Sequence, residues 1–325
     1  MIFFFLIIIN TILFLNFEKI SNKLDLFDTP DLSRKIHIKP IANIGGILIF
    51  LNIIIIIIYQ FYTGQNKTIF FDIFPYLTLM FIIGLVDDRI DLQPNLKLFL
   101  FLIVILFLIT KNELYLISYL KFSFMDSNLE LGFISYIFTV FCFLAFINAI
   151  NMFDGINLHS SIYIIFVLTL FLLKNYYVQL CITILIPILF FSILNFKNKC
   201  FIGNNGTYLI SFIFSCLFIS SYNKINLFLP EEIFLIMFLP GMELIRLTFS
   251  RILKKKHPFK GDKNHIHHLL LKKYNYIKTI FISSLLVITP YLTSKIINDY
   301  FLMIILIFIY IYIYSIFYLK KSTTK

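Results

Sequence analysis

Two short stretches place acidic and amide side chains at the ends of long apolar runs. Asp87 and Asp88 are adjacent and end one run, and Asp154 follows another, three residues after Asn151. A charged group at the centre of a bilayer costs about 2.5–3.5 kcal/mol, so acids next to apolar runs are candidates for function. Adjacent carboxylates repel and need a cation, a donor or a proton. Carboxylate and amide oxygens suit Mg²⁺, so the stretches favour metal-assisted phosphate chemistry.

Each acidic stretch also has a structural interpretation without chemistry. The first could be a solvated helix end with Arg89 as partner of the acids, and the second, residues 148–159, could be an ordinary helix cap and turn. If the second is helical, Asn151 and Asp154 share one face. The position of both stretches beside apolar runs favours the functional interpretation.

Basic residues and histidines form two further clusters. Residues 28–46 contain two prolines, a Gly pair and the donors Arg34, Lys35 and His37, which suit a phosphate. Residues 246–278 hold ten Lys or Arg, with His265, His267 and His268 in four positions. Membrane-surface anchoring explains much of the charge. It explains the histidines poorly, and because no Cys or further His stands nearby to complete a zinc tetrahedron, we favour hydrogen bonding to an anionic substrate.

A short glycine-flanked stretch, residues 203–206, lies between two apolar runs. Such a turn can direct backbone N–H groups toward a phosphate. The signal is weak, because Asn-Gly also forms ordinary turns.

The remainder of the chain is composed for a membrane. Hydrophobic residues make up 60% and charged residues 14% of the 325 positions. A helix crosses a bilayer with about 20 apolar residues. We therefore predict an all-α, polytopic membrane helix bundle, a single integral membrane domain over 1–325. Its eleven expected spans lie near 1–17, 44–62, 71–86, 96–111, 132–148, 159–174, 177–194, 207–222, 232–249, 279–297 and 299–319.

The distribution of positive charge orients the bundle. With the N-terminus outside and the C-terminus cytosolic, 22 of the 28 Lys and Arg fall on the inner side, where basic loops are expected. The net charge of +11 follows from these loops and does not call for a nucleic acid. Cys142, Cys181, Cys200 and Cys216 form no C-x-x-C pair, so we expect neither a disulfide nor a zinc site. The active site is expected from the inner loops 18–43, 87–95, 149–158, 195–206 and 250–278.

Taken together, these motifs resemble the polyprenyl-phosphate N-acetylhexosamine-1-phosphate transferases, glycosyltransferase family 4. The resemblance runs from about residue 28 to 270, with Asp87-Asp88, Asn148-x-x-Asn151-x-x-Asp154-Gly155 and the His-Ile-His-His ending in family order. That ending is similar to the undecaprenyl-phosphate N-acetylglucosamine-1-phosphate branch. It is less similar to the related phospho-MurNAc-pentapeptide transferase.

The resemblance implies a reaction and its participants. A polyprenyl (undecaprenyl) phosphate attacks a UDP-N-acetylhexosamine such as UDP-N-acetylglucosamine and releases UMP. This would be the first membrane step of a cell-envelope glycan, and phosphoryl transfer of this kind mainly needs positioning and charge neutralisation. The implied setting is the bacterial cytoplasmic (inner) membrane, with the site facing the cytosol. Mg²⁺, or alternatively Mn²⁺, is the implied cofactor, and a homodimer is plausible.

Roles carry over from the family position by position. Asp87 and Asp88 would handle the lipid phosphate, with Asp87 a possible base, and Asp154 would orient nucleotide or metal. The metal ligands would be Asn151, Asn204 and Asp154. The substrate contacts would come from Arg34, Lys35, His37, Lys97, Asn148, Asn157, Asn205, His265, His267 and His268.

Three positions depart from the family pattern. Asn204 and Asn157 stand where the family commonly has acids, and Glu243 replaces a common Asp. An amide oxygen can coordinate a cation but brings no charge, so metal affinity should fall. An inactive relative that binds lipid or nucleotide is one alternative. A lipid or solute transporter is another, but it should carry polar groups near the membrane midplane, whereas here they gather at one face.

Overall fold

The computed structural model describes residues 2–28, 40–64, 69–257, 264–297 and 300–323. The predicted site residues Arg34, Lys35 and His37 lie outside the described residues.

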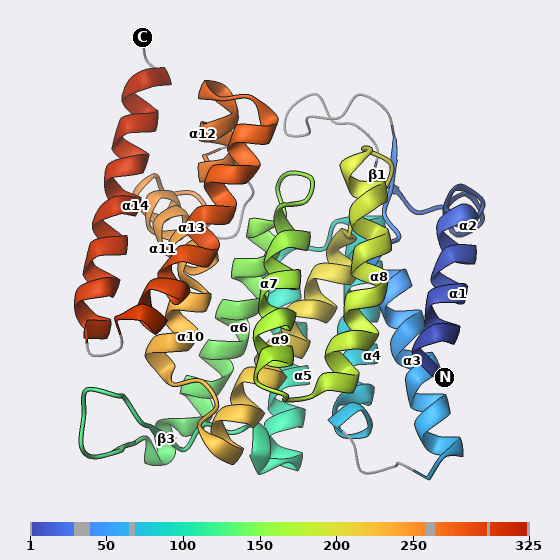
Figure 1. Ribbon diagram of the computed structural model, residues 1–325, viewed down its shortest axis with the longest axis horizontal. Helices are drawn as coiled ribbons and strands as arrows, with labels where there is room; N and C mark the ends of the chain where they lie inside the picture. Colours follow the sequence, from blue (N-terminus) through green and yellow to red (C-terminus); the bar gives the residue numbers. More distant parts are fainter. Residues whose placement is uncertain (1, 29–39, 65–68, 258–263, 298–299, 324–325) are drawn as a thin grey trace.

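Helices make up most of the chain, as its apolar runs predict (Figure 1). They are α1 (Ile2–Leu15), α2 (Phe17–Leu24), α3 (Gly45–Tyr62), α4 (Ile69–Ile90), α5 (Pro94–Lys111), α6 (Ser135–Phe153), α7 (His159–Leu173), α8 (Val178–Phe196), α9 (Gly203–Ile225), α10 (Pro230–Ile236), α11 (Phe238–Leu253), α12 (Ile266–Lys273), α13 (Tyr276–Ile296) and α14 (Phe301–Thr323). Two antiparallel two-stranded pieces accompany them, β1 (Phe27–Asp28) with β2 (Ile41–Ala42) and β3 (Tyr119–Leu120) with β4 (Leu129–Glu130).

Within the described ranges, eight helices are long and apolar enough to cross a membrane. The number is up to ten if each of two bent pairs counts as one span: α1 with α2, bent by 70°, and α10 with α11, bent by 79°. Helix α7, the remaining expected span, has 15 residues. At 1.5 Å per residue it is about 22 Å long, against about 30 Å of hydrocarbon. The count of eleven and the orientation of the termini therefore stay predictions.

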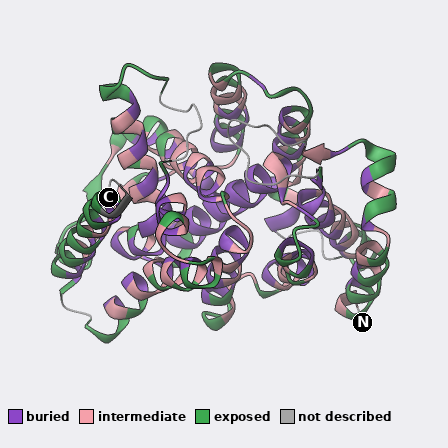
Figure 2. Cartoon of the chain, turned by 90° about the horizontal axis from the view of Figure 1, so that it is seen from above, coloured by how far each residue is buried: buried purple, intermediate pink, exposed green. Residues whose placement is uncertain are grey.

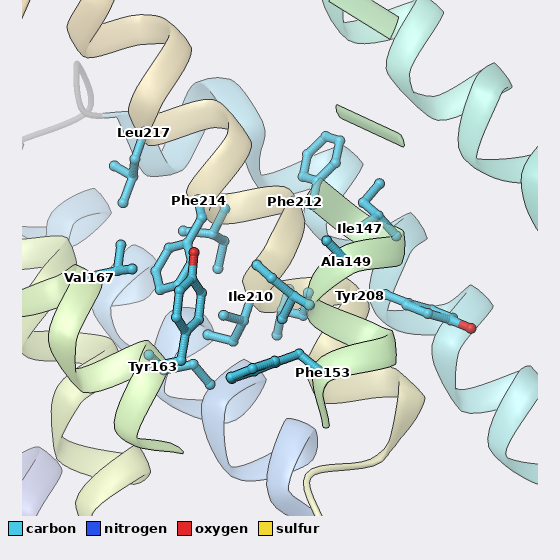
Figure 3. Close-up of a cluster of buried hydrophobic side chains, with 14 of the residues drawn as sticks. Ile147, Ala149, Phe153, Tyr163, Val167, Tyr208, Ile210, Phe212, Phe214 and Leu217 are labelled. Atoms are coloured by element: carbon cyan, nitrogen blue, oxygen red, sulfur yellow. The ribbon is translucent and has the colours of Figure 1, made fainter. Parts of the chain in front are cut away.

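Helix α9 lies at the centre of the bundle and packs against α3, α4 and α6. Of its membrane-crossing window, 83% is buried inside the protein, against 28% for α14 at the periphery. Figure 3 shows α9 side chains, among them Ile210, Phe212 and Phe214, packed with Phe153 and Tyr163 from the neighbouring helices. Figure 2 shows the complementary pattern, with exposed residues concentrated on the outer helices. The core therefore holds the first turn of α9 in a fixed place.

Glycines let two neighbouring helices approach that first turn closely. A Cβ built on Gly84 of α4 would lie 2.4 Å from the Cα of Asn205, and one on Gly46 of α3 would lie 2.3 Å from the backbone N of Gly206. Small residues permit such backbone contact between membrane helices. The last turn of α4, with its two acids, is thus set directly against α9.

The motif-bearing segments meet at one end of the bundle, opposite the β3–β4 hairpin (Figure 1). The strand β2 joins two of them, because the backbone N–H of Phe201 donates to the carbonyl of Ala42 at 2.8 Å. The N–H of Gly45 donates in turn to the carbonyl of Phe201 at 3.1 Å. Segments far apart in the sequence are therefore tied together at the end of the bundle that carries the polar residues.

Candidate active site

A cavity of about 950 Å³ lies where these segments meet. Seven of the predicted site residues line it: Asp87, Asp88, Asn151, Asp154, Asn157, Asn204 and His268. Five others do not: Lys97, Asn148, Asn205, His265 and His267. The cavity wall also contains polar residues that were not predicted as site residues, namely Asp28, Asn43, Arg89, Asp91, Asn195, Asn198 and Tyr276.

Asp88 is bound to the N-terminus of α9. One carboxylate oxygen accepts from the backbone N–H of Asn204 at 2.8 Å. The other accepts from the backbone N–H of Asn205 at 3.0 Å and also from its side-chain amide. A helix N-terminus favours a negative charge through its free N–H groups and its dipole. The carboxylate of Asp88 therefore occupies donors that the sequence offered to a phosphate.

The prediction of a glycine-flanked turn over residues 203–206 is wrong, because Gly203 begins helix α9. Gly203 has φ of +74°, a conformation that other residues adopt at a cost. A Cβ at this position would also lie 2.8 Å from Oδ2 of Asp88. The glycine therefore admits the carboxylate to the first turn of α9.

Asp87 has a separate set of partners. Its side chain is fully buried and lies 2.7 Å from Nζ of Lys97. It also accepts from the hydroxyl of Tyr208 at 2.6 Å and from the backbone N–H of Leu92 at 2.9 Å. Figure 3 shows the Tyr208 hydroxyl directed away from the apolar cluster around Ile210. The two adjacent acids thus have separate sets of donors.

Lys97 and Tyr208 act on this site through Asp87. Lys97 is an expected site residue, but it contacts Asp87 and, at 3.6 Å, Asp91, and it does not line the cavity. Tyr208 was not predicted. It lies on the buried helix α9, and only the fold brings its hydroxyl to an acid 121 positions earlier.

The end of α6 carries the second acidic stretch. Asn151 lies in the last turn of the helix and Asp154 follows it as the C-cap, and both line the cavity as their spacing predicts. The Asn151 side-chain oxygen accepts from the hydroxyl of Thr207 at 2.9 Å, which connects α6 to α9. Asn148 lies one turn earlier and donates to the carbonyl of Leu144 at 2.7 Å within the helix.

Asp154 accepts a hydrogen bond from the hydroxyl of Ser160 at 2.6 Å. Burial raises the pKa of Asp154 from 3.8 to about 6, and the Ser160 hydrogen bond opposes that rise. A bound cation would favour the charged carboxylate. Without a bound cation the group is therefore mostly protonated below about pH 6 and mostly charged at neutral pH.

Amides form another part of the cavity wall. Asn157 donates to the side chain of Asn198 and accepts from Asn195 at 3.4 Å. Asn195 also accepts from the backbone N–H of Leu158 at 2.6 Å. The hydroxyl of Tyr276 donates to the Asn157 carbonyl at 2.7 Å. This uncharged network fixes the turn between α6 and α7 beside Asp154.

The histidine cluster lies on and just before α12. The rings of His267 and His268 have centroids 4.4 Å apart, and those of His265 and His267 are 5.2 Å apart. Burial and the neighbouring imidazoles hold the pKa of His267 well below its usual value, so this ring is neutral near pH 7. Only His268 of the three lines the cavity.

Gly155 brings this cluster against the acidic stretch. A Cβ at Gly155 would lie 2.1 Å from Nε2 of His267. A side chain at position 155 would therefore displace that ring, so the glycine allows α12 to approach the end of α6.

The donors around the cavity suit a hard cation. Among the described residues, no group of three or more His, Cys, Asp or Glu is arranged to hold a metal ion. Mg²⁺ does not need one, because it usually binds one or two carboxylates and completes its shell with water and substrate phosphates. Asp154, Asn151 and Asn204 offer one carboxylate and two amide oxygens along the same cavity wall. These three side chains fit Mg²⁺ or Mn²⁺, and Asp154 is the one among them that brings a negative charge.

The chain matches the model of glycosyl transferase family 4 over residues 70–222, which contain both acidic stretches and Asn204. A probable undecaprenyl-phosphate N-acetylglucosaminyl 1-phosphate transferase of Bacillus subtilis is 27% identical over 266 residues, 78% of this chain and 72% of that protein. The undecaprenyl-phosphate alpha-N-acetylglucosaminyl 1-phosphate transferase of Escherichia coli K12 is 28% identical over 275 residues, 81% of this chain and 74% of the relative. The Salmonella typhi protein of the same description is 28% identical over 274 residues, 78% and 71% of the two chains. The part of the chain that carries the motifs gathered at the cavity is therefore similar to glycosyl transferase family 4.

Proposed function

We propose that the protein transfers N-acetylhexosamine 1-phosphate from a UDP-sugar to polyprenyl phosphate and releases UMP. One observation carries the proposal: α4, α6 and α9 bring Asp88, Asp154 and Asn204 to one cavity at one end of a membrane-capable bundle. A lipid phosphate and a water-soluble nucleotide sugar can meet only at such an interface. The names of the relatives in Bacillus, Escherichia and Salmonella support undecaprenyl phosphate and an N-acetylglucosamine donor.

The proposed location is the bacterial cytoplasmic membrane, with the cavity facing the cytosol. The segments that meet at the cavity are those in which most Lys and Arg of the chain are found. Positive charge concentrates on the cytosolic side of membrane proteins. The cytosol is also where a UDP-sugar is available.

The proposed role of Asp87 is to position groups, not to remove a proton. It accepts from Lys97, Tyr208 and Leu92 in a fully buried position, and each donor stabilises its charge. A phosphate monoester has a second pKa near 6, so the lipid phosphate is largely dianionic at neutral pH. The nucleophile therefore needs no strong base.

Charge balance at the cavity argues for a metal requirement. The described wall holds the acids Asp28, Asp87, Asp88, Asp91 and Asp154, whereas Arg89 is its one Lys or Arg and Lys97 pairs with Asp87 and Asp91 from outside the wall. Both proposed substrates are anions, which such a wall repels. Mg²⁺, held by Asp154, Asn151 and Asn204, would supply the positive charge that a diphosphate needs.

The transfer itself exchanges one phosphorus–oxygen bond for another. An oxygen of the polyprenyl phosphate attacks the β-phosphorus of the UDP-sugar, and the bond from that phosphorus to the bridging oxygen breaks. UMP leaves with this oxygen, and a sugar-diphospho-lipid forms. His268 lines the cavity and is the proposed contact to a phosphate oxygen, and Asp88 keeps the first turn of α9 in place.

The test is transfer of radiolabelled sugar phosphate from UDP-N-acetylglucosamine to undecaprenyl phosphate, using purified protein in detergent with and without Mg²⁺. Other UDP-N-acetylhexosamines are assayed beside it. We expect Mg²⁺-dependent labelling of the lipid, at least a hundredfold weaker in Asp154→Asn, because removal of a charged group that stabilises the transition state costs about 3 kcal/mol. Asp126→Asn, an exposed acid outside the cavity, is the matched control. Absence of labelling with every sugar, from protein shown to be folded, overturns the proposal.

One observation favours a second candidate function. Asn204 lines the cavity where an acid would bind a cation more strongly. A protein that binds nucleotide or lipid without turnover would show UDP-sugar binding but no transfer. Asn204→Asp distinguishes the two, because it should raise Mg²⁺ affinity in an active enzyme and restore nothing in an inactive one.

A further inference from the structure

Helix α12 is too short to be stable alone. It has eight residues, Ile266–Lys273, whereas isolated helices shorter than about 12–15 residues are marginal in water. Yet it carries His268, the one ring of the histidine cluster that lines the cavity. Its position must therefore come from contacts with other elements.

A buried glutamate on α11 supplies the cap of this helix. The side chain of Glu243 is only 2% exposed, and one of its oxygens accepts from the backbone N–H of Ile266 at 2.8 Å. The N-cap residue of α12, His265, makes no side-chain cap hydrogen bond of its own. A carboxylate at this point satisfies a free N–H group and complements the helix dipole.

Arg246 and Tyr312 fix that carboxylate. Arg246 donates to the two Glu243 oxygens at 2.8 and 3.0 Å, and to the carbonyl of Asn264 at 2.8 Å. The hydroxyl of Tyr312, on α14, donates to Glu243 and accepts from Nε of Arg246 at 2.7 Å. Arg246 thus contacts Asn264, just before the His cluster, while Glu243 contacts Ile266, within the cluster.

We propose that Glu243, Arg246 and Tyr312 form a clamp that sets the position of His268 in the cavity. Glu243 is then a positioning residue that acts through α12, and the C-terminal helix α14 supports the active site through Tyr312. The inference rests on the proposed function for its kinetic readout, but its structural readout is independent of any activity.

The buried charges make the clamp sensitive to single changes. Removing one partner of a buried ion pair leaves the other uncompensated, which costs far more than the pair contributes. Glu243→Gln keeps the shape of the side chain but removes the charge that Arg246 and the helix N-terminus require. Glu243→Asp keeps the charge on a shorter side chain, and Tyr312→Phe removes a single hydroxyl.

The first experiment measures hydrogen exchange of the backbone amides of residues 266–273 by mass spectrometry in the full-length protein in detergent. Loss of a hydrogen bond to a charged group should raise exchange about tenfold or more in Glu243→Gln. Tyr312→Phe should raise it by about fivefold, the effect of one ordinary hydrogen bond. Glu113→Gln, an exposed glutamate before β3, is the matched control and should match the wild type.

The second experiment measures transfer kinetics in the same proteins. The clamp predicts that Glu243→Gln lowers kcat by about tenfold with KM for the UDP-sugar nearly unchanged, and that Glu243→Asp recovers part of kcat. In a His268→Asn background, Glu243→Gln should have little further effect, because both changes act through one imidazole.

The outcomes separate the clamp from the proposed function. Unchanged exchange in folded Glu243→Gln or Tyr312→Phe protein overturns the clamp, whatever the enzyme does. Raised exchange with an unchanged kcat overturns the positioning role. Raised exchange in the variants, together with a wild type that transfers nothing, supports the clamp and counts against the proposed function. If Glu243→Gln does not fold, Glu243→Asp and Tyr312→Phe give the same tests.

Discussion

Replacing Asp88 by asparagine tests whether this carboxylate holds the bundle together or only serves the chemistry. The carboxylate accepts from the backbone N–H of Asn204 at 2.8 Å and of Asn205 at 3.0 Å, and from the Asn205 side chain. Asparagine keeps one accepting oxygen and turns an NH₂ group toward the donors. At least one charge-assisted hydrogen bond is lost, worth about 1.5–3 kcal/mol, together with up to about 1 kcal/mol from the helix dipole.

We therefore expect Asp88→Asn to lose about 2–4 kcal/mol of stability. The assay is thermal or denaturant unfolding in detergent, compared with Asp91→Asn. The Asp91 side chain is 80% exposed and lies 3.6 Å from Lys97, so its removal should cost less than about 0.5 kcal/mol. Transfer activity and stability should both fall in Asp88→Asn, whereas Asp91→Asn should keep both.

One result would refute this reasoning. Removal of a strained functional group commonly leaves a protein as stable or more stable. If Asp88→Asn abolished transfer while unfolding at or above the wild-type midpoint, Asp88 would be a substrate or metal group and not the cap of α9.

Three further predictions follow from the same region. Gly155→Ala should lower kcat more than tenfold with the fold retained, as circular dichroism would show, because its Cβ would lie 2.1 Å from Nε2 of His267. Leu158→Gly should raise the free energy of unfolding by about 1 kcal/mol in denaturant titration, because Leu158 has φ of +63°, which glycine adopts without strain. A decrease of about 1 kcal/mol would contradict this prediction, because the lost side-chain contacts would then outweigh the relieved backbone strain. The Asp154 pKa of about 6 predicts that Mg²⁺ affinity, measured by calorimetry, falls about tenfold from pH 7.5 to 5, since the neutral acid is a poor ligand; a pH-independent affinity would exclude Asp154 as a ligand.

The helices were predictable because their signal is local. Apolar runs of membrane length give nearly all of them, and most ends differ by a few residues. The first apolar run ends near Asn16, where α1 gives way to the more polar α2, but the bend at Met237 was not predictable, since hydropathy is continuous across it. A change of direction there depends on packing against neighbouring helices, and a sequence window does not contain those neighbours.

The candidate site was predictable in its residue types and only partly in its connections. Polar residues beside apolar runs identified Asp88, Asn151 and Asp154, and all three line the cavity. The sequence left open whether a cation, a donor or a proton offsets the repulsion between Asp87 and Asp88; in the structure consecutive helix residues point in different directions and meet different donors. Leu92 and Lys97 are near Asp87 in the sequence, but the hydroxyl of Tyr208 and the N–H groups that bind Asp88 come from α9, more than a hundred positions later.

The most direct test of the central claim is the fate of the β-phosphorus of the donor. UDP-N-acetylglucosamine carrying radioactive phosphorus in the β position is incubated with undecaprenyl phosphate, Mg²⁺ and the purified protein, and the lipid and aqueous products are separated. A sugar-phosphate transferase places the label in the lipid fraction and releases unlabelled UMP. Label that stays in the aqueous phase as UDP while sugar enters the lipid would contradict the account, because the enzyme would then transfer the sugar without its phosphate.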